Sequence, residues 1–378
     1  MKIDDFRPGD FCQQFHYQSF QPAGVNHGWT WEEPEIHDLL AEANRRLGEL
    51  NGLSLIVPDI DRFIQMHVIK EAQTSSRIEG TRTEMDEALE EDPEEITPEK
   101  RDDWREVRNY IAAMNQSVDA LSNLPLSNRL LCDAHATLLQ GVRGEGKTPG
   151  EFRRSQNWIG GATLADAVFI PPHHDEVPRL MGDLEAFWHN EEIRVPHLIR
   201  IAISHYQFET IHPFLDGNGR IGRLLIALYL VSKGLLQQPC LYVSAHLEKH
   251  RAAYYDSLTG VRTRGDLGQW IRFFLVAIIE TACRGVDTFQ KIHLLRHTTG
   301  ERISTLGVRS AKARRILDYL YQKPIVTGGE LSRRLGISQP TIDRLIVDLV
   351  RLDILQEMTG KQRNREFWFK DYYQLFLE

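Results

Sequence analysis

At 378 residues the chain exceeds the length at which one hydrophobic core usually stops growing, so two or three structural units are expected. Hydrophobic residues make up 42% and charged residues 26% of the sequence, which excludes an intrinsically disordered chain. The net charge of -8 argues against coating nucleic acid or an anionic membrane through bulk charge, so such partners would need a local basic patch.

The N-terminal sequence and the cysteines predict a soluble, cytoplasmic protein. The sequence MKIDDFRPGDF has no basic segment followed by an apolar stretch, and no run reaches the roughly 18 apolar residues that span a bilayer. The cysteines are scattered and form no CxxC pair, which is typical of reduced thiols rather than a disulfide framework or a zinc ribbon. They are Cys12, Cys132, Cys240 and Cys283.

The first half of the chain predicts mostly helices. Residues 1–30 show no sustained period and are expected to form an irregular surface arm. Apolar residues recur at helical spacing over 34–50, and again after Pro58 as far as a stop at Gly80. The stretch 84–103 is rich in Glu and Asp and is expected to be a solvated connector, with the start of a helix as the alternative. Helical periods return over 104–121, 128–139 and 176–188.

The segment 157–172, NWIGGATLADAVFIPP, interrupts the helices. Short β-prone runs flank Gly160-Gly161, and two prolines end the segment, so a β-hairpin is predicted. His173, His174 and Asp175 follow directly, and their proline-bounded loop favours solvated polar residues over a metal site. Further helices are expected over 194–208, 219–233, 247–259 and 267–283, with a long helix continuing towards 295.

Residues 212–223, HPFLDGNGRIGR, join two predicted helices and concentrate groups that bind phosphate. The glycines let backbone N–H groups converge on one point, and the start of a helix adds orphan amides and the positive end of the helix dipole. Arg220 and Arg223 lie three residues apart, so both can reach one polyphosphate.

Asp216 is suited to Mg²⁺, which takes one or two carboxylates and several waters. His212 has the near-neutral pKa of a base that accepts a hydroxyl proton. A surface turn with fortuitous glycines is the alternative interpretation.

This loop resembles the signature of the Fic family, HxFx(D/E)GN(G/K)RxxR, at every specified position, and the resemblance extends over 30–290. It implies a mainly α fold, a Fic-type helical bundle with a β-hairpin flap. It also implies an adenylyltransferase that transfers AMP from ATP, with Mg²⁺, to a Ser, Thr or Tyr hydroxyl of a target protein or of the chain itself. His212 would be the catalytic base and Asp216 the metal ligand. The nucleotide-binding residues would be Gly217, Asn218, Gly219, Arg220, Ile221, Gly222 and Arg223.

Three further segments take roles from the same resemblance. Residues 169–172 look like the flap that aligns a target segment by adding it as a strand. Tyr254-Tyr255 resembles a tyrosine pair that lines the adenine pocket, and Tyr255 is the predicted cofactor contact, with core packing as the alternative for either ring. Residues 75–80, SSRIEG, resemble the inhibitory motif (S/T)xxxE(G/N). Glu79 would pair with Arg223 and remove the cation that orients the γ-phosphate.

The last 70 residues predict a winged helix-turn-helix. Helical segments over 311–321, 329–335 and 338–352 precede two alternating strands, 354–358 and 366–369. Residues 309–378 carry 13 Lys and Arg against 9 Asp and Glu, an excess of basic residues in an acidic chain. Arg333, Arg334, Arg344, Lys361, Arg363 and Arg365 could contact DNA phosphates, and Gln339 and Thr341 could contact base edges. The alternative is a protein-docking or dimer element.

Two hypotheses follow for the whole chain. The first is an enzyme that AMPylates protein and is restrained in cis by Glu79. The second is a transcriptional regulator whose Fic body senses nucleotide while the winged helix binds DNA. We expect three domains, an N-terminal helical region with the inhibitory helix (1–105), a Fic catalytic core (106–300) and the winged helix (301–378), and the resemblance suggests a homodimer.

Overall fold

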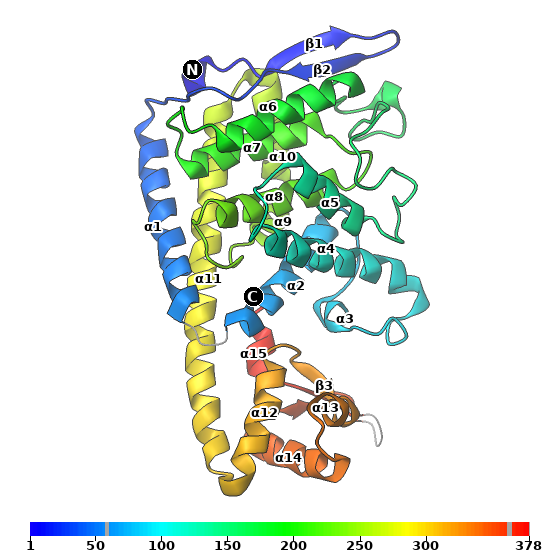
Figure 1. Ribbon diagram of the computed structural model, residues 1–378, viewed down its shortest axis with the longest axis vertical. Coiled ribbons are helices and arrows are strands. Elements are labelled where there is room, and N and C mark those ends of the chain that lie inside the picture. Colours follow the sequence, from blue (N-terminus) through cyan, green and yellow to red (C-terminus); the bar gives the residue numbers. More distant parts are fainter. Residues whose placement is uncertain (57–59, 361–364, 378) are drawn as a thin grey trace.

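The computed structural model describes residues 1–56, 60–360 and 365–377, which form a mainly helical molecule with two small antiparallel sheets (Figure 1). The helices of the N-terminal half are α1 Pro34–Ile56, α2 Ile60–Ile78, α3 Met85–Leu89, α4 Arg101–Ala120, α5 Asn128–Leu138 and α6 Val177–His189. Those that follow are α7 His197–Ile211, α8 Asn218–Ser232, α9 Ser244–Lys249, α10 Arg251–Arg264, α11 Leu267–Ser304, α12 Ser310–Leu320, α13 Gly328–Leu335, α14 Gln339–Arg351 and α15 Lys370–Gln374. The strands are β1 Gly9–Gln13, β2 Gln18–Pro22, β3 Ile325–Thr327, β4 Gln356–Glu357 and β5 Glu366–Trp368.

Helices α7 and α8 form the centre of the bundle. Every residue of α7 from Leu198 to Ile211 is buried, and so are nearly all residues of α8 as far as Leu230. A helix that is buried all round must be surrounded by other elements. α6 packs on α7, and α2, α4 and α5 pack on α8. The loop that joins this central pair therefore starts and ends in rigid, well-packed structure.

The long helix α11 runs from the helical bundle around α7 and α8 to the C-terminal unit (Figure 1). It is one continuous helix of 38 residues, whereas the sequence predicted two successive helices. α1 packs along it, and a Cβ at Gly285 would lie 2.8 Å from Leu50 Cδ1. The glycine thus permits a close approach of the two helices without ending α11. Because α11 spans residue 300, no loop separates the predicted catalytic core from the winged helix.

The C-terminal unit has the predicted winged-helix order of three helices and a ribbon. Its sheet has the strand order β3-β5-β4, with Ile325 and Gln356 both paired to Trp368. The short strand β3 was not predicted, because three residues are too few to show a period. Lys361 and Arg363 lie outside the described residues.

One expectation for the N-terminal half was wrong, and a second held only in part. The arm expected to be irregular forms a β-hairpin, β1–β2, in which Gly9 pairs with Pro22. The acidic stretch is only in part a connector, because it contains α3, with Met85 and Leu89 buried, and the start of α4. Among the helices of the described residues, none combines the length and the apolar character that crossing a membrane requires.

Candidate active site

The loop between α7 and α8 carries the predicted catalytic residues. His212 caps the C-terminus of α7 with left-handed backbone angles, φ 51° and ψ 61°, which few residues other than glycine adopt. Gly217 precedes α8 and also has a positive φ, 74°. These two left-handed positions turn the chain sharply between two buried helices.

Side chains beneath the loop fix its shape. The Asn218 side chain accepts a hydrogen bond from the Phe214 N–H and donates one to the Phe214 carbonyl, both 2.8 Å long. The His135 ring stacks on Phe214 at 3.9 Å, and its Nε2 donates to the Asp216 carbonyl at 3.0 Å. Because the side-chain amide of Asn218 is hydrogen-bonded to Phe214, it stabilises the shape of the loop. The group of Asn218 that is available to an anion is its backbone N–H.

Two side chains that the sequence analysis did not single out hold His212 in its left-handed conformation. Arg153 donates from Nε to the His212 carbonyl (2.9 Å) and from Nη2 to the Pro172 carbonyl (2.6 Å). Asn157 Nδ2 donates to the same His212 carbonyl at 3.1 Å. Burial lowers the pKa of Arg153 to about 10. Arg153 therefore joins the end of the predicted flap to the backbone of the predicted base.

Replacing Arg153 with alanine is expected to lower the free energy of unfolding by about 2–4 kcal/mol, because four buried or part-buried backbone carbonyls lose a donor. Urea unfolding measures this loss. Arg154 is its exposed neighbour, and Arg154→Ala is the matched control, expected to change stability by less than about 0.5 kcal/mol. Equal stability of the two variants would contradict the anchoring role.

The imidazole of His212 is neutral at physiological pH. Burial lowers its pKa to about 4, and the positive charge of Arg153 acts in the same direction, whereas Glu79 opposes the shift. The near-neutral pKa expected from the sequence is therefore not found, because burial disfavours the charged form of the ring. The residue is half-buried rather than sealed in the core. A neutral imidazole is the form that can accept a proton.

Arg220 is held by carboxylates on both sides. Its Nη1 lies 3.0 Å from Glu106 Oε2 in α4, and its Nη2 lies 3.5 Å from Asp216 Oδ1. The side chains of Arg220 and Glu106 are each 4% exposed, and Arg143 also contacts Glu106 at 2.8 Å. Glu106 is a site residue that the sequence did not reveal, since it lies more than a hundred positions before the motif.

Arg223 is paired with the predicted inhibitory segment of α2. Its Nη2 donates to Glu79 Oε1 at 2.7 Å and to the Ser75 carbonyl at 2.9 Å, and its Nε donates to Ser75 Oγ at 2.8 Å. The Arg223 side chain is 1% exposed. The structure thus brings together Glu79 and Arg223, the pair expected from the motif.

The Glu79 carboxylate lies over the first turn of α8. A Cβ added at Gly219 would lie 2.3 Å from Glu79 Oε1, so the absence of a side chain at Gly219 makes room for the carboxylate. Burial raises the pKa of Glu79, but the charge and hydrogen bond of Arg223 outweigh this effect, and the net pKa is below its ordinary value. Glu79 therefore stays ionised, as an anion next to amides that have no acceptor within the helix.

The other predicted nucleotide contacts fall into different environments. Ile221 is 1% exposed and belongs to the core, so only its backbone could face a ligand. The Gly222 carbonyl accepts a hydrogen bond from His205, whose Nε2 accepts one from the Tyr254 hydroxyl. Tyr254 is 1% exposed, whereas Tyr255 is 40% exposed. Of the tyrosine pair, only Tyr255 is accessible to a nucleotide.

Glu209 is a buried carboxyl beside the motif that the sequence analysis missed. A Cβ at Gly222 would lie 2.2 Å from its Oε1, which is buried and has no hydrogen-bond partner among the described residues. Burial raises the pKa of Glu209 to about 7; Arg223 opposes the shift and Glu79 adds to it. Its position three residues before His212 was the only signal in the sequence.

Replacing Glu209 with glutamine is expected to reduce the loss of stability between pH 5 and pH 8. A carboxyl whose pKa is raised from 4.5 to about 7 binds its proton more tightly in the folded state, so stability falls as pH rises through this window. The glutamine variant avoids this loss, which lowers the free energy of unfolding by about 3 kcal/mol at pH 8. Urea unfolding at both pH values measures it, and the exposed Asp102→Asn is the control. Parallel pH profiles of Glu209→Gln and the wild type would contradict the prediction.

The segment 157–172 is a β-bridge rather than the predicted hairpin. Ile159 pairs with Phe169 as an isolated antiparallel bridge, and a short 3-10 turn, Leu164–Asp166, occupies the middle. On the other side, the Phe20 N–H of β2 donates to the Ile170 carbonyl at 2.9 Å. The Asp166 side chain accepts hydrogen bonds from nearby backbone N–H groups, which favours a compact loop over paired strands.

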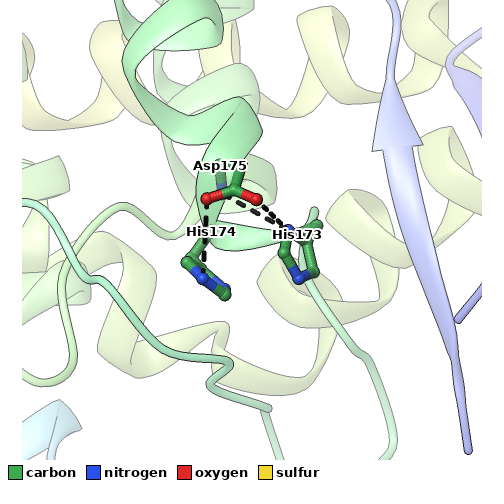
Figure 2. Close-up of side chains that lie close together, drawn as sticks. All are labelled: His173, His174 and Asp175. Carbon is green, nitrogen blue, oxygen red and sulfur yellow. Dashed lines mark hydrogen bonds and ion pairs between the residues drawn. The ribbon is translucent and has the colours of Figure 1, made fainter. Parts of the chain in front are cut away.

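Among the residues that the structure describes, two clusters of histidine and carboxylate side chains lie outside the loop. His173, His174 and Asp175 meet at the start of α6, where Asp175 lies 3.3 Å from His173 Nδ1 and 3.6 Å from His174 Nε2 (Figure 2). Burial and the neighbouring His173 lower the pKa of His174. The second cluster, His246, His250 and Glu280, was not anticipated from sequence.

Family models match three regions of the chain. The model for the Fic/DOC family N-terminal region matches residues 37–119, and the Fic/DOC family model matches residues 125–230, together half of the chain. A model described as winged helix-turn-helix DNA-binding matches residues 309–358. These regions contain Glu79, the loop 212–223 and α14.

Curated relatives include proteins named "Protein adenylyltransferase Fic" from Culex quinquefasciatus (37% identical over 126 residues) and Aedes aegypti (36% over 126 residues). In each case the match covers 33% of this chain and 22% of the relative, so the chain spans about a fifth of these relatives' length.

Solved structures with the same fold include a Fic family protein from Desulfovibrio desulfuricans G20, with a TM-score of 0.57 and 22% identity, over 89% of this chain and 96% of that chain. Fic-1 from C. elegans has a TM-score of 0.53 and 22% identity, over 66% and 71% of the two chains. By these matches the chain belongs to the Fic/DOC family and carries a C-terminal winged helix-turn-helix.

Proposed function

We propose that this protein is an adenylyltransferase that transfers AMP from ATP to a Ser, Thr or Tyr hydroxyl of a protein. The observation that carries the proposal is the placement of His212 in the same loop as an anion site made by the first turn of α8 and Arg223. The Glu79 carboxylate already lies at this anion site, which agrees with the preference of a helix N-terminus for negative charge.

In the proposed reaction, the target hydroxyl oxygen attacks the α-phosphorus of ATP, its proton passes to His212, and the bond to pyrophosphate breaks. Arg223 and Arg220 would stabilise the negative charge of the outer phosphates, together with the backbone N–H groups of Asn218 and Gly219. Tyr255 is the proposed adenine contact. No covalent enzyme intermediate is required, since the attacking group belongs to the target.

Asp216 fits the role of a magnesium ligand. Its side chain is 41% exposed, and its Oδ1 accepts a hydrogen bond from the Gly217 N–H at 2.6 Å. Its Oδ2 lies close to Gly144, where an added Cβ would be 3.0 Å away. A bound Mg²⁺ would neutralise part of the phosphate charge. Asp216 would hold the ion at the mouth of the loop.

Glu79 is the proposed intramolecular inhibitor. Its carboxylate occupies Arg223 and covers Gly219, the two positions where the outer phosphates would bind. ATP would then bind without the cation that sets its γ-phosphate, and the α-phosphorus would be misaligned for attack. Because the pKa of Glu79 is lowered, protonation does not release it near neutral pH.

The direct test uses ATP labelled on the α-phosphate. Label should appear on protein with the wild-type chain, and this labelling should be lost with His212→Ala. Labelling that persists in His212→Ala, or no labelling even when Glu79 is removed, would argue against the enzyme.

A second candidate function is a transcriptional regulator, in which the Fic body senses nucleotide and residues 309–378 bind DNA. It is favoured by the match to a DNA-binding winged-helix model and by exposed basic residues, Arg333 and Arg344, on α13 and α14. A homodimer is a further proposal.

A further inference from the structure

The acidic segment 90–95, EEDPEE, follows α3 and lies against the winged helix. A groove of about 1350 Å³ runs between them, with Glu90, Glu91, Asp92 and Glu95 on one wall and residues of α13, α14, β3 and β5 on the other. Figure 1 shows the loop after α3 next to α13 and β3. The segment is therefore a bridge between the helical bundle around α7 and α8 and the C-terminal unit.

Ion pairs fasten the acidic segment to the winged helix. Lys323 Nζ lies 3.0 Å from Glu90 Oε2 and 3.1 Å from Glu330 Oε1. Arg334 of α13 pairs with Glu91. On the catalytic side, the Glu90 carbonyl accepts a hydrogen bond from Trp104 Nε1 at 3.1 Å. The segment is thus anchored at the bundle and presents its carboxylates to the winged helix.

The covered face is the one through which a helix-turn-helix meets DNA. The recognition helix of such a motif enters the major groove, and flanking basic residues contact phosphates. Here the groove is lined by Gln339 and Val347 of α14, by Arg333 and Arg334 of α13, and by Arg365 beside the wing. Glu90, Glu91, Asp92 and Glu95 line the same groove, so their negative charge lies within it.

We propose that segment 90–95 is an intramolecular competitor for duplex DNA, which occupies the DNA-facing groove of the winged helix and has to leave it before DNA binds. The inference rests on the DNA-binding candidate of the proposed function. Five of the six residues are acidic, so the segment repels phosphate, and its pairs with Lys323 and Arg334 engage cations that DNA would need.

The test measures the affinity of the full chain for a fluorescent duplex of mixed sequence, by anisotropy at several salt concentrations. In the neutralised variant, Glu90→Gln, Glu91→Gln, Asp92→Asn and Glu95→Gln are combined. These side chains are exposed or half-buried, so the core is left intact. We expect the dissociation constant to fall at least about tenfold, with a steeper salt dependence, because basic groups become available to phosphates.

A matched control removes the same charge at the far end of the molecule, through Asp4→Asn, Asp5→Asn, Asp10→Asn and Asp38→Asn, all exposed. It is expected to change affinity less than about threefold, since charges beyond a Debye length are screened. Adding Arg333→Ala and Arg334→Ala to the neutralised variant should remove the gain.

Two results would overturn the inference, and they differ from each other. If the wild type binds DNA but the neutralised variant binds no more tightly than the control, the segment is not a competitor, and DNA binding stands. If the neutralised variant fails to bind DNA even at low salt, the DNA-binding candidate fails and the inference fails with it.

Discussion

Replacing Glu79 with glycine is expected to raise the rate of AMP transfer to protein at least about tenfold. A tenfold change in rate corresponds to about 1.4 kcal/mol in the activation free energy. The substitution frees Arg223 and uncovers the first turn of α8, so the γ-phosphate regains its cation. The measurement is the initial rate at which label from the α-phosphate of ATP becomes attached to protein. Glycine is tolerated because Glu79 follows the last residue of α2.

The control for this experiment is Glu84→Gly, which removes an exposed glutamate at the start of α3. Its rate should stay close to that of the wild type. An unchanged or lower rate for Glu79→Gly would count against the inhibitory role of the ion pair and leave it as a structural contact between α2 and α8.

Replacing His212 with alanine in the Glu79→Gly background is expected to lower AMP transfer by about 10²–10⁴-fold, the usual contribution of a general base. The left-handed backbone is held by Arg153 and Asn157 through the residue's own carbonyl, so the loop should keep its shape without the imidazole. The same labelling assay measures the loss, and the affinity for ATP should change little.

His37→Ala is the matched control, since it removes an exposed histidine of α1 far from the loop. It should retain the rate of the Glu79→Gly variant. A His212→Ala variant that keeps full activity would require a different base, and Glu209, the buried carboxyl nearby, would be the first residue to examine.

Helical periodicity predicted the fold well where helices are amphipathic and failed where another element decided the outcome. α4 and α5 were expected within a few residues of their observed ends. α11 was expected as separate segments, and its continuity depends on packing against α1, which no local pattern reveals. The β1–β2 hairpin was missed because its residues show no sustained alternation, although β2 bonds to the flap.

The motif predicted which residues gather at the site, but not what holds them. Glu79 and Arg223 form the expected contact because both belong to recognisable patterns. Arg153 and Glu106 contact the loop from 59 and 114 positions away. Contacts between such distant positions depend on the tertiary fold, so the residue types alone gave no reason to choose them among the many other arginines and glutamates.

The unbroken helix α11 has a mechanical consequence. Its 38 residues span about 57 Å at the usual rise per residue, and backbone hydrogen bonds run through the whole length. A protease that needs an extended stretch of chain therefore finds no cleavage site between the two units along this rod. Because the helix is continuous, a rotation of α11 at its N-terminal end also moves its C-terminal end, and with it the winged helix.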